Sequence, residues 1–265
     1  MSDPIARRFQ YVLGSEQQTT LSDLNSRLFY RKKFNLHAES SNIPMFCACG
    51  AQFTPDHPFS CHLLRADPNK PDNILRRLSP VTQRHDAIIE SSLVPALRNC
   101  GVAFLVVKRV STIVRLKPDL AIEFNDKSTD CLADLQVIHS YSPSYVHNVL
   151  EKQLAIAEQG KRNKYEQFWN STETGPLRDF YGLIITTDGI LSKQFITCIL
   201  KLANHAQHSQ MLPFGTSVTD FAHRLIDHIH TSLHTGNSQI LMAGLKLARR
   251  GIDPRASHPL DPSRV

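Results

Sequence analysis

The 265-residue chain lacks long apolar runs: no stretch approaches about eighteen consecutive apolar residues, the length that indicates a membrane-spanning helix. We therefore expect no membrane-spanning helix. The first residues, MSDPIARRFQYVLG, contain an early acid and lack the apolar core of a secretory signal. We therefore expect an intracellular protein.

Cysteine is also sparse, with six residues in the chain. A disulfide framework is typical of a smaller secreted domain, so we do not expect one here. Cys100, Cys131 and Cys198 are isolated within apolar runs and are predicted to be small core residues. The other three are clustered with a histidine, which is typical of metal ligands.

The net charge is +6, and most of it arises from one segment. Between Arg65 and Asp119 there are ten basic residues and five carboxylates, which leaves +5 of the total. A local excess of positive charge favours a polyanionic partner through contacts with phosphates. A solvated basic face is the alternative interpretation of the same count.

The chain divides into an extended polar lead-in, a small cysteine-rich segment and one larger domain. We predict boundaries at residues 1–45 (lead-in), 46–64 (cysteine/histidine segment), 65–79 (linker), 80–250 (main domain) and 251–265 (disordered tail). Ser79 and Pro80 suit the start of a helix that ends near Asn99, with a kink expected at Pro95 and a C-cap at Gly101.

The main domain alternates strands and helices, which predicts the α/β class. Four strands are expected, at Ala103–Arg109, Leu116–Phe124, Cys131–Ile138 and Phe180–Thr187. Helices are expected at about Tyr145–Tyr165 and in three pieces around 191–208, 217–234 and 238–250. Within the last region, His223, Asp227, His230 and His234 share one helix face, which we expect to be solvated.

The cysteine-rich segment predicts a structural zinc site. Its candidate ligands are Cys47, Cys49, His57 and Cys61, which are the thiolates and imidazole that zinc prefers in four-coordinate sites. His57 and Cys61 are four residues apart, so one helical turn would bring them to the same face. His62 is a rival fourth ligand, and a chance cluster of buried thiols is the alternative.

Two aspartates interrupt strands that are otherwise apolar. Asp119 follows Lys117-Pro118 at the start of one strand, and Asp134 lies in the next. Buried carboxylates without an obvious structural purpose repel each other, and a divalent cation relieves that repulsion. Magnesium suits such a pair because it binds one or two protein carboxylates and completes its shell with water and phosphate.

A lysine near the carboxylates would complete a hydrolytic site by stabilising charge on the reacting phosphate. Gln136 occupies the usual position, two residues after the second acid. The following helix offers Lys161, which continues the apolar stripe of Val146, Leu150, Leu154 and Ala157, while Lys164 lies close to the same line. Snorkelling at the helix end is the alternative explanation for such a lysine.

Taken in order, these motifs resemble the restriction-like endonuclease domain of retrotransposons lacking long terminal repeats. The resemblance covers about residues 46–250 and rests on the Cys/His segment, Arg84-His85-Asp86, Lys117-Pro118-Asp119, Asp134-x-x-Val137 and Lys161-x-x-Lys164-Tyr165. It implies a PD-(D/E)XK core, a mixed sheet flanked by helices, with a small zinc segment before it and helices after it. Only about 45 residues precede the Cys/His segment, so we expect a free-standing relative of these domains, a domesticated copy or a fragment.

The resemblance also implies an activity and roles for individual residues. Asp119, Asp134 and Lys161 would be catalytic, with Lys164 as a further candidate, and the cation would be Mg²⁺ or Mn²⁺. Arg84, His85 and Lys117 would contact DNA or support the site, and Glu90 could be an accessory acid. Such domains nick target DNA so that a reverse transcriptase can prime from the break. The resemblance therefore implies DNA as the partner and a nuclear location, with RNA or a reverse transcriptase as further partners in related elements.

Two alternatives remain. One is a nucleic-acid-binding remnant without activity, and the other is an interaction protein whose carboxylates form structural ion pairs.

Overall fold

A computed structural model describes residues 46–54, 56–64, 79–106, 118–124, 131–142, 144–172 and 179–248 of the chain. These residues fall into two compact units, one containing His85–Leu233 and the other containing the described residues before and after that range. The predicted lead-in, the linker after Leu64, Lys117 and the C-terminal tail lie outside the described ranges. Among the described helices, none is both long and apolar enough to cross a membrane.

The first unit contains a four-stranded mixed sheet with the order β1-β2-β3-β4. Its strands are β1 (Ala103–Val106), β2 (Leu120–Glu123), β3 (Cys131–Ile138) and β4 (Asp179–Thr186). The β1–β2 and β2–β3 pairs are antiparallel, whereas β3 and β4 run parallel because a helix connects them. The α/β class and the mixed sheet flanked by helices, both predicted from the sequence, are confirmed.

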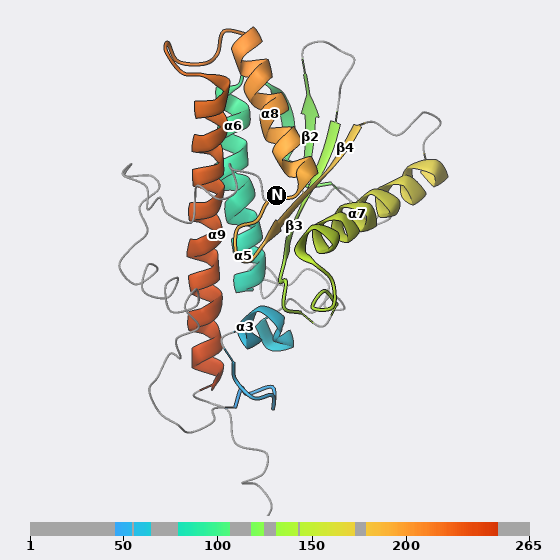
Figure 1. Ribbon diagram of the computed structural model, residues 1–265, viewed down its shortest axis with the longest axis vertical. Coiled ribbons are helices and arrows are strands. Elements are labelled where there is room, and N and C mark those ends of the chain that lie inside the picture. The colour runs from blue at the N-terminus through green and yellow to red at the C-terminus, as the bar shows by residue number, and fades with distance from the viewer. Residues whose placement is uncertain are drawn as a thin grey trace, which may run out of the picture. The chain divides into compact units, whose positions relative to one another are not determined.

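Alternation along the strands sends side chains to two different helical layers. Leu120, Cys131, Ala133, Leu135 and Leu183 belong to the main core, which also contains residues of α6 (Val94–Asn99), α8 (Lys193–His208) and α9 (Val218–Ala248). The intervening strand positions Ile138 and Ile184 pack instead with Leu154 and Ala157 of α7 (Leu150–Thr172). Figure 1 shows α7 on one side of the sheet and α6 with α8 on the other.

The predicted helix after Ser79 forms in three parts. It consists of α5 (Pro80–Ile88), a π-helical turn (Ile89–Leu93) and α6, which ends before Gly101 at a φ of 64°. Pro95 lacks the backbone N–H that a regular helix would need, and the wider turn lies immediately before it. The helix therefore continues past Pro95 rather than ending early, and its departure from regular α-helix is the π-helical turn.

Several predicted elements differ from the structure. α7 begins at Leu150 rather than near Tyr145, because residues 144–147 form turns and Gln153 Nε2 donates hydrogen bonds to the carbonyls of Tyr145 and Asn148. The buried strand predicted at Ala103–Arg109 is instead an edge strand with alternating exposure, and Leu105 is 64% exposed. The helical pieces predicted at 217–234 and 238–250 form one continuous helix, α9, within the described residues.

The prediction that the histidine face of the C-terminal helix is solvated is also wrong at two positions. His230 and His234 are both buried. The carbonyl of Gly189, in the turn after β4, lies 2.7 Å from His230 Nε2 and accepts its hydrogen bond. Burial lowers the pKa of His230 to about 4, although the hydrogen bond to Gly189 opposes the shift, so this imidazole is neutral in the folded protein.

Candidate functional site

The two predicted aspartates lie side by side at one edge of the β2–β3 pair. Leu120 pairs with Ala133 in the antiparallel register, so continuation by one residue sets Asp119 opposite Asp134. The two carboxyl groups are close enough for each to shift the pKa of the other. Asp134 faces the α7 side of the sheet, because its neighbours Ala133 and Leu135 point to the opposite layer.

Asp119 is held by two donors on the same oxygen. The backbone N–H of Leu135 donates to Asp119 Oδ2 over 2.7 Å, and His85 Nε2 lies 3.2 Å from the same atom. The other ring nitrogen of His85, Nδ1, is 3.1 Å from Asp86 Oδ1. His85 therefore bridges two carboxylates, one on its own helix and one at the start of β2.

Asp134 is held from α7. The ammonium group of Lys161 donates a hydrogen bond to Asp134 Oδ2, and the carboxylate is 5% exposed. Tyr165, one helical turn after Lys161, also hydrogen-bonds Asp134 through its side chain and packs its ring 4.8 Å from that of Phe180. Lys161 was predicted from helical periodicity to point inward, and the structure brings it to Asp134.

A glycine permits α7 to approach the sheet beside this carboxylate. Gly182 is the β4 partner of Asp134 in the parallel register. A Cβ atom at Gly182 would lie 3.4 Å from the backbone of Glu158 and 3.4 Å from Gln194 Oε1. A larger side chain would push α7 away, and Lys161 lies one turn beyond Glu158 on that helix.

The two carboxyl groups differ in electrostatic environment. Burial and the charge of Asp119 raise the pKa of Asp134 to about 6, although Lys161 opposes the shift. Burial also disfavours ionised Asp119, but the hydrogen bond and charge of His85 outweigh it and hold its pKa below the usual value. Of the two, Asp134 retains a proton more readily.

His85 carries the positive charge that balances Asp119. Burial disfavours the imidazolium, yet the hydrogen bonds to Asp119 and Asp86, together with their charges, raise the pKa of His85 to about 9. His85 is therefore a cation at neutral pH, and both of its ring nitrogens donate. The carboxylate pair is thus flanked by one imidazolium and one ammonium.

Other predicted site residues lie elsewhere. Lys164 is exposed, and its neighbour Tyr165 takes the inward position instead. Arg84, expected to contact DNA or support the site, is 5% exposed and donates from Nη1 to Asn237 Oδ1 over 2.7 Å, so its guanidinium is not presented to a nucleic acid. Glu90 is exposed in the π-helical turn, as a solvated helix residue would be.

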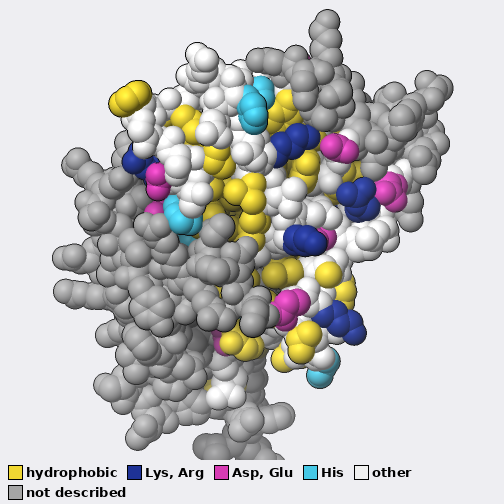
Figure 2. Space-filling view, turned by 45° about the horizontal axis from the view of Figure 1, so that its top comes forward, with side chains coloured by type: hydrophobic (Ala, Val, Ile, Leu, Met, Phe, Trp, Pro, Cys, Tyr) yellow, Lys and Arg dark blue, Asp and Glu magenta, His cyan; other side chains and the backbone are white. Residues whose placement is uncertain are grey.

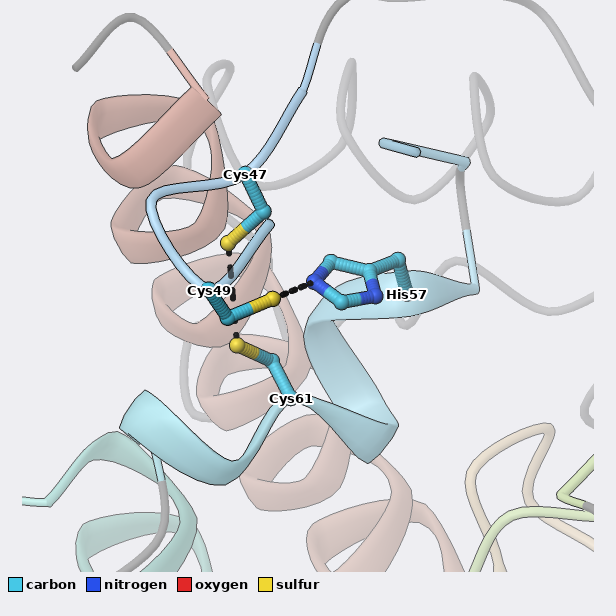
Figure 3. Close-up of side chains that lie close together, drawn as sticks. All are labelled: Cys47, Cys49, His57 and Cys61. Carbon is cyan, nitrogen blue, oxygen red and sulfur yellow. Dashed lines mark hydrogen bonds between the residues drawn. The ribbon is translucent and has the colours of Figure 1, made fainter. Parts of the chain in front are cut away.

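The predicted zinc ligands form a compact cluster in the second unit. One ligand atom from each of Cys47, Cys49, His57 and Cys61 lies within 4.8 Å of the others, and no second such group is found among the described residues (Figure 3). The Sγ atoms of Cys47 and Cys61 are 3.7 Å apart, and Cys49 Sγ is 3.3 Å from His57 Nε2. A tetrahedral zinc with Zn–S bonds of about 2.3 Å separates its sulfur atoms by roughly 3.8 Å, so the donor set fits a metal such as zinc.

Local structure explains how the four ligands converge. Cys47 and Cys49 belong to one tight turn, which is closed where Gly50, at a φ of 87°, donates its N–H to the Cys47 carbonyl. His57 and Cys61 lie one helical turn apart at α3 (His57–Ser60). His62, the rival ligand, is exposed.

The cluster packs against the C-terminal half of α9 within the second unit. Ala48 donates its N–H to the carbonyl of Leu247 over 3.2 Å. Phe59, Cys61 and Leu64 share a core with Ile240 and Leu241. A Cβ atom on Gly244 would come within 2.5 Å of Pro58, so this glycine permits the close approach. The Cys/His cluster thus packs against the end of α9.

The described surface is mixed in charge. Figure 2 shows Lys and Arg side chains interspersed with Asp and Glu side chains on the face in view, among the residues that are coloured. Of the ten basic residues counted between Arg65 and Asp119, Arg84 and Arg98 fall within the described ranges, and Arg84 is buried. The predicted basic segment is therefore mainly outside them.

Three contributors to the site were given no role from the sequence, although Asp86 and Tyr165 stand in the motifs quoted above. Tyr165 lies beside Asp134, Gly182 permits the approach of α7, and Asp86 contacts His85. Tyr165 follows Lys161 at a spacing of four, so helical periodicity could have identified it. Neither a protein-family model nor a curated protein matches the chain.

Proposed function

We propose that this protein is a metal-dependent DNA endonuclease, or nickase, that hydrolyses phosphodiester bonds at the Asp119–Asp134 pair. The observation that carries the proposal is the position of Asp119, just before β2, opposite the buried Asp134 of β3, with an inward lysine from the following helix on Asp134. Each acid of this arrangement had been singled out from the sequence as a candidate metal ligand, and the lysine as its companion.

The donor set of the pair fits a hard divalent cation. Asp119 and Asp134 offer carboxylate oxygens in a partly buried position, which are the protein ligands that Mg²⁺ and Mn²⁺ prefer. The repulsion between the two is relieved in this structure by His85, which contacts Asp119, and by Lys161, which contacts Asp134. A bound cation would supply charge neutralisation at the scissile phosphate and an activated water.

Lys161 has the position to act on the reacting phosphate. Its side chain is 18% exposed and its ammonium group hydrogen-bonds Asp134, so the side chain lies between the carboxylates and solvent. From there an ammonium can stabilise the negative charge that develops on the phosphoryl oxygens as the P–O bond breaks. Lys164, exposed on the same helix, has no part in this proposal.

The fold supports the same assignment. Resemblance to the restriction-like endonucleases implies a mixed sheet flanked by helices, and the chain has such a sheet with acids on its second and third strands. The PD-(D/E)XK assignment, the retrotransposon origin and the DNA substrate are parts of the proposal. The Cys/His cluster would serve as a structural metal site that fixes its segment on α9.

A second candidate is a non-catalytic nucleic-acid-binding remnant. The observation that favours it is that His85 and Lys161 already neutralise the acids, as structural ion pairs would. The absence of a charged residue at Gln136, where the related pattern has its lysine, points the same way. Two independent ion pairs would not require the acids to meet, whereas Asp119 and Asp134 lie opposite each other and shift each other's pKa.

The test is incubation of supercoiled plasmid with the purified full chain in Mg²⁺ or Mn²⁺, beside a gel-shift assay on duplex DNA. Conversion to nicked circle that requires the cation supports the endonuclease. Binding of duplex without nicking in either cation supports the remnant. Neither binding nor nicking contradicts both candidates and favours an interaction protein.

A further inference from the structure

We propose that His85 is a positioning residue that holds Asp119 in the orientation needed to bind the catalytic cation, rather than a DNA contact. The inference rests on the proposed function, because it gives His85 a part in the same metal site. Of the two roles that the resemblance implies for His85, a DNA contact or support of the site, the geometry favours the second.

Both donors of His85 are already engaged within the protein. Nε2 is 3.2 Å from Asp119 Oδ2, and Nδ1 is 3.1 Å from Asp86 Oδ1. The imidazole ring has two nitrogens and no other polar side-chain atom, so none is left for a phosphate oxygen. A DNA contact by His85 would require one of these bonds to break.

The geometry at Asp119 is that of an oriented ligand. Oδ2 accepts from His85 and from the backbone N–H of Leu135, whereas Oδ1 takes neither bond. Two donors on one oxygen fix the rotation of the carboxylate about its last bond, and that rotation determines where Oδ1 points. Groups that orient metal ligands in this way typically contribute about 10- to 100-fold to metal affinity or activity.

Asp86 extends the chain of contacts outward. It lies next to His85 on α5 and is the more exposed partner, with 52% of its side chain accessible against 29% for His85. Its carboxylate fixes the imidazole ring from the far side, as carboxylates do for histidines in metal sites. The series Asp86, His85, Asp119 therefore runs from solvent to the carboxylate pair, with His85 as the link.

The experiment combines Mn²⁺ titration calorimetry, plasmid nicking and duplex DNA binding on the zinc-loaded full chain. The variants are His85→Ala, His85→Gln, whose amide can restore a donor near Nε2, and His208→Gln, which removes an exposed histidine at the end of α8. We expect His85→Ala to weaken Mn²⁺ affinity about 10- to 100-fold, with part of the loss restored in His85→Gln. The His208→Gln protein should match the wild type.

DNA binding without divalent cations separates the two roles of His85. Loss of a phosphate contact lowers the slope of log affinity against log salt by about 1, whereas loss of a positioning residue leaves it unchanged. Unchanged Mn²⁺ affinity in a folded His85→Ala protein overturns the inference, whether or not the salt slope falls. A wild-type chain that binds no Mn²⁺ and nicks no plasmid overturns the proposed function itself, which is a distinct result.

Discussion

The ammonium group of Lys161, on α7, donates a hydrogen bond to Oδ2 of Asp134, on β3, across 27 residues of sequence. The contact links the helix and the strand that the proposed chemistry requires to act together. It also supplies a compensating positive charge to Asp134, which needs one because this residue is 5% exposed. A lysine arriving from the next helix can therefore replace the one missing at Gln136.

Replacement of this lysine should affect catalysis far more than replacement of its neighbour. We expect Lys161→Met to reduce the rate of plasmid nicking by about 100- to 1000-fold, the usual effect of removing one donor that stabilises transition-state charge. Lys164→Met, in which the lost side chain is exposed, should change the rate by a few-fold at most. Equal losses in the two variants would show that Lys161 has no special part.

The Cys/His cluster should bind one metal ion per chain. Elemental analysis of protein purified without chelator is expected to give one equivalent of zinc, and Cys61→Ala should abolish it. Cys100→Ala is the matched control, because Cys100 is buried in the main core away from the cluster. Retention of full zinc content by Cys61→Ala would exclude this site.

The helix-on-helix contact at Gly236 should tolerate no side chain. A Cβ atom there would lie 2.5 Å from Arg84 Cβ and 2.9 Å from its Cα, so the backbones would have to separate. We expect Gly236→Ala to lower the free energy of unfolding by about 1–3 kcal/mol, as overpacking does. Gly160→Ala, at an exposed α7 position with nothing within 4 Å of the added atom, should stabilise by up to about 1 kcal/mol. Urea denaturation measures both, and a stabilising Gly236→Ala would contradict the packing.

The buried histidine of α9 should make the fold sensitive to acid. The folded pKa of His230 is lowered to about 4, whereas the unfolded chain titrates near 6.5, so the unfolded state binds the extra proton first. Stability from this group is complete above about pH 6.5 and is lost as the pH falls toward 4. By pH 5 the loss amounts to about 2 kcal/mol.

The measurement is urea denaturation at pH 7.5 and pH 5 for wild type and His230→Gln. Other titrating groups are shared, so the difference between the two proteins isolates His230. We expect the wild type to lose about 2 kcal/mol more than the variant between these pH values. Equal losses would mean that His230 is protonated without penalty in the folded protein.

Short-range patterns predicted the centre of the candidate site. Asp119 and Asp134 were identified because they interrupt two short strands that are otherwise apolar, and the helical period of the apolar stripe pointed to Lys161. The same argument favoured Lys164 only weakly, and the structure leaves that side chain exposed. Cys100, Cys131 and Cys198 were predicted to be core residues, and all three are buried.

Tertiary contacts account for what the patterns missed. Thr235-Gly236-Asn237 indicated a break between two helices, yet α9 continues because Gly236 packs directly on Arg84 and Asn237 bonds its guanidinium. His230 was predicted to lie on a solvated face, but it is buried and donates its hydrogen bond to the carbonyl of Gly189, 41 residues away in the sequence. Such partners are distant in sequence, so local periodicity carries no information about them.

The most direct test of the central claim is the nicking of supercoiled plasmid by Asp119→Asn and Asp134→Asn proteins in saturating Mg²⁺ or Mn²⁺. The control is Glu123→Gln, which neutralises an exposed acid at the other end of β2. We predict that the wild type and Glu123→Gln nick at similar rates, whereas both asparagine variants lose activity although they remain folded. Undiminished nicking by either asparagine variant would contradict a catalytic metal site at this pair.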